Sequence, residues 1–256
     1  MLAIYKKEMR SYFISPVGFV YIGVFLAVAA LLSCYTTLLS SSYDTSTYFT
    51  ILIVAFIVML PLLTMKLFAE EKKLRTEQLL LTAPISITSM VMGKFLAAMT
   101  MFVGTTLLSC FNFIPLYIIA FEERAAAELS GNYSAATQHI GPATAQIIGC
   151  VIGIVLLGAA FLAIGLFVSS LCENQLSAAV ITIAVLLLMV VLNFVNTSEL
   201  IDSYLLRFLI DWVCVLSRYS YFSAGIFDIA ALIYYLSLTS VFLFLTVRVY
   251  EKRRWS

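Results

Sequence analysis

Residue types that often carry catalysis are few and scattered in this chain. His139 is the single histidine, so an HExxH zinc motif and a His-based general-base constellation are both ruled out. The single Gly-Lys step, Gly93-Lys94, is followed by Phe95, whereas a Walker A loop requires Ser or Thr there. The cysteines are Cys34, Cys110, Cys150, Cys172 and Cys214. They form no CxxC pair, which argues against a disulfide framework or a thiolate metal site. We therefore expect no enzyme, no cofactor, no metal ion and no nucleotide site in this chain.

Charge is instead concentrated in one short stretch. Seven charged residues lie in the twelve positions from Lys66 to Glu77, although the whole chain holds only 15 basic and 14 acidic residues. The leucines at 79–81 follow directly, and Pro84 ends the helical pattern because the residue before a proline resists helical geometry. A solvated surface helix would explain the charges but not the leucines. A docking element for another subunit would explain both, since interfaces combine an apolar core with a polar rim.

The amino-acid composition indicates which class of protein contains this charged stretch. Hydrophobic residues make up 62% of the chain, the mean hydropathy is +1.04, and charged residues account for 11%. Ordinary soluble domains carry about 25% charged residues. The net charge of +1 gives no basic surface for nucleic acid. The sequence is that of an integral membrane protein.

Six segments without Asp, Glu, Lys, Arg or His are long enough to span a bilayer. They are residues 11–43, 45–65, 95–121, 140–172, 174–198 and 229–247. A helix needs about 20 residues to cross about 30 Å of hydrocarbon. Open sheets are excluded, because their edges cannot be satisfied in lipid. We predict one all-α transmembrane domain over residues 1–256, with two short interfacial helices in the interrupted uncharged run 78–93.

The basic residues predict the orientation of this domain. Six alternating spans place 12 of the 15 Lys and Arg residues on one face, together with both termini and the loop at 66–94. The positive-inside rule makes this face cytoplasmic. We therefore expect a multi-pass protein of the plasma membrane, the bacterial inner membrane, with a cytoplasmic helix in that loop.

Two amphipathic segments flank the spans. The first, residues 1–15, predicts an interfacial helix with Leu2, Tyr5, Met9 and Tyr12 on its apolar face and basic residues opposite. The second, residues 199–228, lies on the outer side before the last span. It is expected either to rest on the membrane as an amphipathic strut or to re-enter the bilayer as a lid over an exit path.

Polar groups are scarce within the predicted spans. None of these spans contains an ionisable group of the kind that ion-driven carriers and channels use. Asn112 and Asn193 are the notable polar side chains, which could form interhelical hydrogen bonds or line a substrate path. Gly149 and Gly153 form a GxxxG pair, which we expect to serve packing within the chain rather than dimerisation.

Four stretches together resemble the ABC-2 permeases, the membrane subunits of ABC exporters. They are KKEMRSYFISPVGFVYIGVF, EEKKLRTEQLLLTAP with MGKFLA, IGLFVSSLCENQLSAA, and YFSAGIFDIAALIYYLSLTSVFLFLTVRVYEKRRW. The chain is most similar to permeases of the gliding-motility and nitrous-oxide-reductase maturation type. It departs from the family's loop pattern at Arg75, where glycine is usual, and at Gln78, where glutamate is usual.

The resemblance implies an exporter permease that pairs with a second copy or with a paralogous permease, among membrane lipids. Two separate ABC ATPase subunits would drive it through the first cytoplasmic loop, with the turn between the fourth and fifth spans as a second contact. The implied docking residues are Glu70, Glu71, Lys72, Lys73, Arg75, Thr76, Glu77, Gln78, Leu79, Leu80, Glu173 and Asn174.

Two alternatives stay open at this point. A permease of this type could transmit force to an extracytoplasmic partner without carrying cargo. A free-standing secondary carrier or channel is the rival from another class, for which inverted repeats would be expected. A largely apolar path would suit a lipid-like cargo.

Overall fold

A computed structural model of the chain describes residues 1–39, 43–78, 85–129, 141–197 and 214–255. Its helices are α1 (Leu2–Ile14), α2 (Pro16–Ser33), α3 (Ser46–Lys73), α5 (Ile87–Ser109), α6 (Ile114–Leu129), α8 (Thr144–Leu171), α9 (Gln175–Thr197), α11 (Tyr219–Ser223) and α12 (Ile229–Trp255). A π-helical turn, η1 (Cys34–Leu38), extends α2, and a 3-10 turn, η2 (Cys110–Phe113), joins α5 to α6. The described residues contain no strand.

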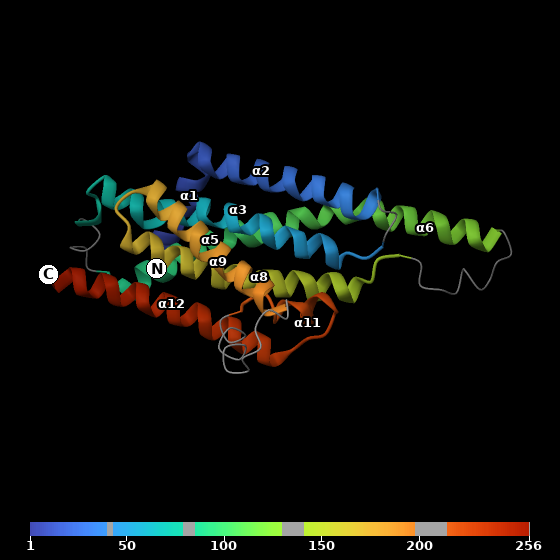
Figure 1. The fold of residues 1–256 in the computed structure, drawn as a ribbon. Helices are drawn as coiled ribbons and strands as arrows, with labels where there is room; N and C mark the ends of the chain where they lie inside the picture. The colour runs from blue at the N-terminus through green and yellow to red at the C-terminus, as the bar shows by residue number, and fades with distance from the viewer. Residues whose placement is uncertain (40–42, 79–84, 130–140, 198–213, 256) are drawn as a thin grey trace.

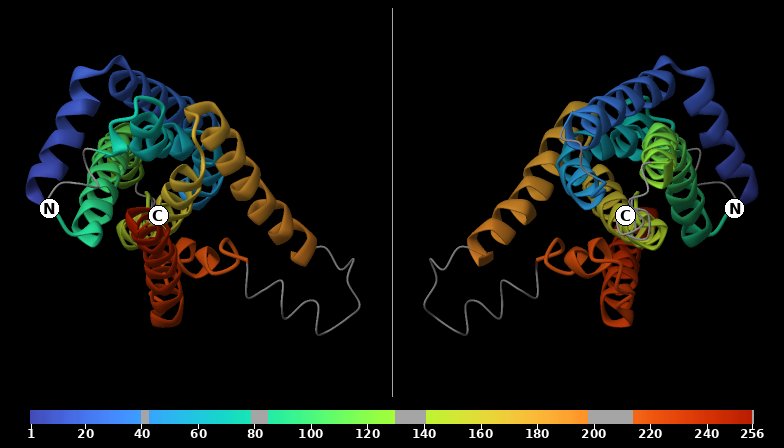
Figure 2. Two further views of the ribbon diagram at one scale, coloured as in Figure 1. Left: turned by 90° about the vertical axis from the view of Figure 1, so that its left-hand side faces the viewer. Right: turned by 90° about the vertical axis from the view of Figure 1, so that its right-hand side faces the viewer.

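Six helical runs are long and apolar enough to cross a membrane. They cover Pro16–Thr37, Ser46–Lys73, Ile87–Ala126, Thr144–Leu171, Gln175–Val195 and Ile229–Arg254. The prediction of an all-α membrane protein with six spans is confirmed. Figure 1 shows most of these helices along one common direction, with α9 inclined to the others (Figure 2).

The third span is much longer than a bilayer requires. From Ile87 to Ala126 it runs for 40 residues, or roughly 60 Å at 1.5 Å per residue, about twice the hydrocarbon thickness. Its α6 part projects beyond the other helices (Figure 1). The run begins after Ser86, whose side chain accepts a hydrogen bond from the Ser89 amide as an N-cap. The prediction of two interfacial helices within residues 78–93 is therefore wrong for the second one, because Ile87 to Gly93 form the first turns of α5.

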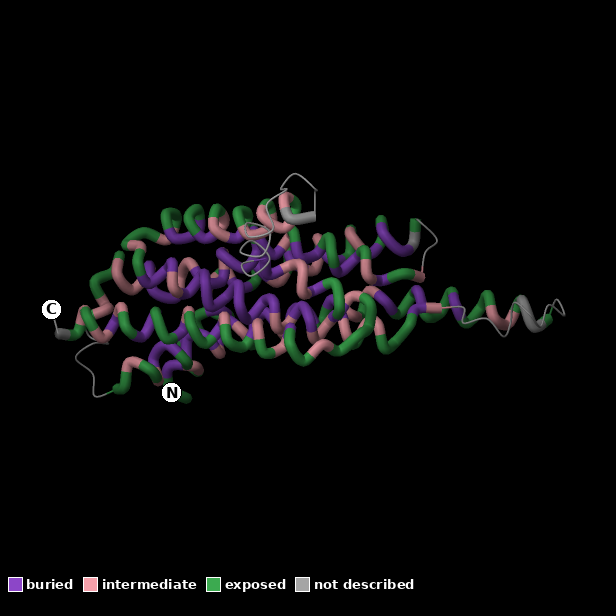
Figure 3. Tube along the Cα trace, turned by 60° about the horizontal axis from the view of Figure 1, so that its bottom comes forward, coloured by how far each residue is buried: buried purple, intermediate pink, exposed green. Residues whose placement is uncertain are grey.

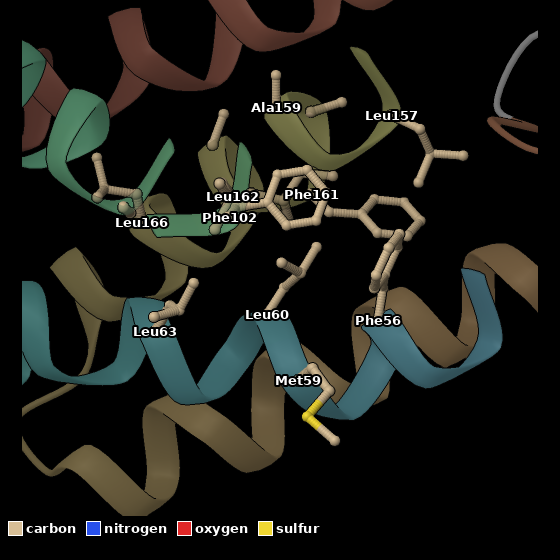
Figure 4. Packing of buried hydrophobic residues seen from close by; sticks show 14 of the residues in the cluster. Phe56, Met59, Leu60, Leu63, Phe102, Leu157, Ala159, Phe161, Leu162 and Leu166 are labelled. Atoms are coloured by element: carbon tan, nitrogen blue, oxygen red, sulfur yellow. The ribbon is translucent and has the colours of Figure 1, made fainter. Parts of the chain in front are cut away.

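Helix α8 is the centre of the bundle, in contact with α3, α5, α9, α11 and α12. Small residues let its neighbours approach closely: a Cβ at Gly158 would lie 2.1 Å from the Phe102 ring of α5. Phe102 in turn meets Phe56 of α3 edge to face, with 5.2 Å between ring centres. Figure 4 shows these rings with Phe161 and the surrounding leucines of α3 and α8. Buried residues follow the inner faces of the bundle, and exposed ones cover its outside (Figure 3).

The GxxxG pair packs within the chain, as predicted. A Cβ at Gly149 would lie 2.9 Å from the Phe222 carbonyl oxygen, and one at Gly153 would lie 2.7 Å from the Phe222 Cβ. The lack of a side chain at both glycines thus allows the short helix α11 to pack closely against α8. Residues 199–213 of the predicted outer segment lie outside the described residues. The described remainder of that segment forms α11 and its flanking turns.

Helix α1 exists as predicted, and the face that it buries includes Glu8 beside part of the predicted apolar face. Ile4, Glu8 and Tyr12 are buried, whereas Leu2 is 74% exposed. Among the four residues predicted to form its apolar face, Tyr12 alone is buried, and its hydroxyl donates to the Leu63 carbonyl at 2.8 Å. The helix lies against α2 and α5. Tyr5 and Met9 are partly buried against the core, and the apolar pattern left out Glu8 because its partner lies inside the bundle.

Candidate functional site

The charged stretch and both chain termini lie at one end of the bundle. We call this the charged end: the region where α1, the last turns of α3 and α12, the first turns of α5 and the α8–α9 turn meet. It forms the left-hand side of Figure 1 and faces the viewer in the left panel of Figure 2.

Helix α3 extends to Lys73, so most of the charged stretch is helical and the connection to α5 shortens to residues 74–86. The helix ends in a tight turn in which the Thr76 amide donates to the Glu71 carbonyl at 2.9 Å. The Arg75 amide donates to the Lys72 carbonyl at 3.0 Å. Arg75 adopts a φ of 57°, the left-handed conformation that this type of helix end usually assigns to glycine.

A buried lysine holds three helices together here. Lys94 of α5 has a side chain that is 1% exposed, and its ammonium lies 3.1 Å from Glu8 Oε1 and 2.9 Å from Glu71 Oε2. The ammonium also donates to the Leu67 carbonyl and sits 4.9 Å from the centre of the Phe68 ring. A buried charge requires such partners because its desolvation is expensive. We call Lys94, Glu8, Glu71 and Lys7 the lysine network.

Lys7 completes the lysine network on its outer side. Its ammonium lies 2.8 Å from Glu71 Oε1, and its side chain is 57% exposed. Partial burial favours the neutral amine, but the hydrogen bond to Glu71 and the charges of Glu71 and Glu8 outweigh it and raise the pKa of Lys7. Lys7 therefore stays protonated at neutral pH, and the network balances two ammonium groups with two carboxylates.

The lysine network corrects one expectation from the sequence. The spans were predicted to hold no ionisable group, yet Lys94 lies within the helical run Ile87–Ala126. The uncharged-segment criterion failed because it started the third span at Phe95, whereas the helix starts eight residues earlier.

Lys72 ties α3 to the α8–α9 turn. Its ammonium donates to the Ser170 carbonyl and, at 3.0 Å, to the Cys172 carbonyl. These carbonyls belong to the C-terminal end of α8, where helix geometry leaves acceptors without intrahelical donors and where a cation is favourable. These two hydrogen bonds hold the exposed residues Glu173 and Asn174 beside the last turn of α3.

The last turn of α12 joins the same assembly. Arg253 lies 3.2 Å from Glu77 Oε1 and 5.7 Å from the centre of the Tyr250 ring. Tyr250 is buried and packs on Phe68 of α3, with 4.6 Å between the ring centres. The connection after α3 is thus anchored to α12 as well.

The structure divides the predicted docking residues into groups. Exposed at the charged end are Lys73, Arg75, Gln78, Glu173 and Asn174. Those with partners inside the chain are Glu71, Lys72 and Glu77. Glu71 and Glu77 were expected on the rim of a docking surface, and they instead hold helices together. Leu79 and Leu80 lie outside the described residues.

The remaining predicted positions are only partly accessible. Glu70 and Thr76 are half-buried and line a polar cleft of about 310 Å³ between α1 and α3. The Thr76 hydroxyl donates to the Glu71 carbonyl at 3.3 Å. Leu74, which was not predicted, is 64% exposed between Lys73 and Arg75. An apolar residue inside a charged run is the signal that could have identified it.

The two asparagines proposed for a substrate path lie on different elements. Asn112 belongs to η2 and Asn193 to the last turns of α9, and both side chains are partly buried. Within the described part of the chain, no three His, Cys, Asp or Glu side chains are grouped to hold a metal ion.

Comparison with known proteins assigns no family: no protein-family model matches the chain, and no curated protein matches it. Any function therefore has to be inferred from the residues and their geometry.

Removing the buried ammonium should destabilise the protein strongly. Lys94→Met leaves Glu8 and Glu71 with only the exposed Lys7 as a cationic partner, and breaking a buried ion pair costs about 3–5 kcal/mol. Lys73→Met, at an exposed position of the same end, should change stability by less than about 0.5 kcal/mol. Thermal unfolding of both variants in detergent measures the difference. Adding Glu8→Gln and Glu71→Gln to Lys94→Met should restore part of the loss, whereas equal melting of the two lysine variants would contradict a structural role for Lys94.

A substitution at Arg75 should instead increase the stability of the protein. Because Arg75 occupies a left-handed conformation, Arg75→Gly should stabilise the protein by about 0.5–1 kcal/mol. Lys73→Gly, two residues earlier in helical geometry, should destabilise it by about the same amount. The two melting temperatures should therefore move apart. A shift of both in the same direction would show that the turn at Arg75 has a different backbone conformation.

Proposed function

We propose that this chain is the transmembrane permease subunit of an ATP-driven exporter of the ABC-2 type. The observation that carries the proposal is the meeting of two expected contact segments at the charged end. The turn after α3 presents Leu74 and Arg75, the α8–α9 turn presents Glu173 and Asn174, and Lys72 fastens the two segments together. An apolar side chain surrounded by exposed polar residues has the composition of a docking surface.

The energy for transport would come from outside the chain. The sequence contains no Walker A loop, so ATP would be hydrolysed by two separate ATPase subunits docked at the charged end. A bound ATPase that changes conformation would move α3 and α8 together through Lys72. The lysine network would carry this displacement to α1 and α5. Such a change requires that the ATPase bind the two permease conformations with different affinities.

The glycine-like backbone at Arg75 supports the resemblance to ABC-2 permeases. Glycine is usual at this position in their loops, and Arg75 keeps the conformation that glycine adopts without strain. The same turn geometry would therefore serve both residues. A second permease copy or a paralogous permease would complete the transporter, with lipids around it.

The projecting helix α6 favours a second candidate function. Its exposed apolar residues include Ile118 and Phe121, and the helix as a whole projects beyond the neighbouring spans (Figure 1). A helix of this length could reach an extracytoplasmic partner and transmit force to it without moving cargo. A free-standing carrier is less favoured, because Lys94 is held by Glu8 and Glu71 and is not available as an ion site.

We place the charged end in the cytoplasm and the protein in the bacterial inner membrane, on the basis of the Lys and Arg asymmetry. In a cysteine-free background, a cysteine at Lys73 or Lys252 should resist a membrane-impermeant thiol reagent applied to intact cells. A cysteine at Ser130 should react with it. Labelling at Lys73 from outside would reverse the orientation and remove the basis for ATPase docking.

Docking itself can be tested by co-expression with an ABC ATPase encoded beside the permease. Leu74→Asp places a charge at the centre of the proposed surface, and loss of a central interface anchor costs about 2 kcal/mol or more. We expect this variant to lose the ATPase during purification, and Leu79→Ala with Leu80→Ala to do the same. Phe121→Asp, on an apolar residue of α6 that is also well exposed, should keep the complex. If Leu74→Asp and the double leucine variant both retain the ATPase and its permease-stimulated ATP hydrolysis, the charged end is not the docking surface.

A further inference from the structure

A groove between α9 and α12 is separate from the charged end. It has a volume of about 510 Å³ and is lined by Met189 of α9, by Arg218 before α11, and by Ile233, Ser237 and Val241 among the residues of α12. Its walls are mainly apolar, and Ile233 and Val241 are 60% and 54% exposed. Figure 2 shows α9 and α12 diverging, with α11 between them.

Arg218 places a positive charge at one end of the groove. Its guanidinium stacks over the Tyr234 ring, 4.4 Å from the ring centre. Its Nε is buried and has no hydrogen-bond partner among the described residues. No described carboxylate forms an ion pair with Arg218 either. A partly buried cation is costly unless an anion neutralises it, so an anionic group bound beside Arg218 would be favourable.

The groove extends about as far as one leaflet. On α12 it is lined from Ala230 to Phe242, which corresponds to roughly 18 Å at 1.5 Å per residue. Half of the hydrocarbon thickness is about 15 Å. Ala230 lies at the start of the uncharged segment 229–247, and Arg218 stacks on Tyr234 near the same end. The cation thus lies toward one membrane surface, and the apolar part continues toward the bilayer centre.

The apolar walls and the positive charge at one end indicate the chemistry of the occupant. A hydrocarbon chain would match the apolar walls. An anionic headgroup would match Arg218, because guanidinium groups bind phosphate oxygens through paired hydrogen bonds.

We propose that this groove is a binding site for an anionic phospholipid of the leaflet opposite the charged end. The phosphate lies against Arg218, and one acyl chain follows Ile233, Ser237 and Val241 toward the bilayer centre. The inference does not depend on the proposed transport function, because it uses only the groove, its charge and its place in the membrane segment.

Quenching of a tryptophan by brominated lipids tests the site directly. In a protein carrying Trp212→Phe and Trp255→Phe, Val241→Trp places the reporter in the groove. Leu236→Trp places a matched reporter on α12 outside the groove, at a residue of similar exposure. The vesicles contain either brominated phosphatidylglycerol or brominated phosphatidylcholine, diluted into unbrominated phosphatidylcholine.

At Val241→Trp, half-maximal quenching should require about ten-fold less phosphatidylglycerol than phosphatidylcholine, as expected for one charge-assisted hydrogen-bonded contact. At Leu236→Trp the two lipids should quench alike. Adding Arg218→Gln should abolish the preference at Val241→Trp, and Arg218→Lys should keep most of it. Circular dichroism checks that each variant remains helical.

Three results would overturn the proposal. If Arg218→Gln leaves the ten-fold preference unchanged, or if both reporters show the same preference, the groove is not an anionic lipid site. If Val241→Trp is shielded from both lipids while Leu236→Trp is quenched, another protein surface covers the groove, and a second copy of the chain is its occupant.

Discussion

The Lys94 ammonium is the interaction on which the arrangement of the charged end depends. A fully buried cation cannot be left without partners, so α1 and α3 must each place a carboxylate beside α5. This requirement determines which faces of α1, α3 and α5 turn inward at the charged end. Lys7 adds a fourth charge, but its exposed position gives it a smaller share of the stability.

The other ionic contacts extend this arrangement to the rest of the bundle. Lys72 joins α3 to the end of α8, and Arg253 joins α12 to the connection that follows α3. Helix α8 touches most of the other helices. The surface around Leu74 is therefore connected to the core through α3 and α8. Close approach at Gly158 removes the space that would let α8 and α5 move independently.

The fold could be predicted from the sequence to the extent that uncharged runs mark the spans. Their ends could not, because α3 and α5 continue through Lys66 and Lys94 into regions that a charge-free criterion excludes. The burial of Glu8 on α1 was missed for a related reason. Apolar periodicity treats Glu8 as exposed, and its partner Lys94 lies 86 residues away in the sequence. In the sequence, the glycine-like turn at Arg75 was visible only as a departure from a family pattern. No local sequence pattern indicated the hydrogen bonds of Lys72 to the end of α8.

The separation between Glu8 and Lys94 also sets an order of events during biosynthesis. Helix α1 leaves the ribosome before α5, and the 86 positions up to its cationic partner take roughly 4 to 17 s at common translation rates. During that interval Glu8 has no buried partner, and the helix has to wait in a hydrated environment at the membrane surface. Helix α1 is therefore synthesised several seconds before the residue that locks it in place.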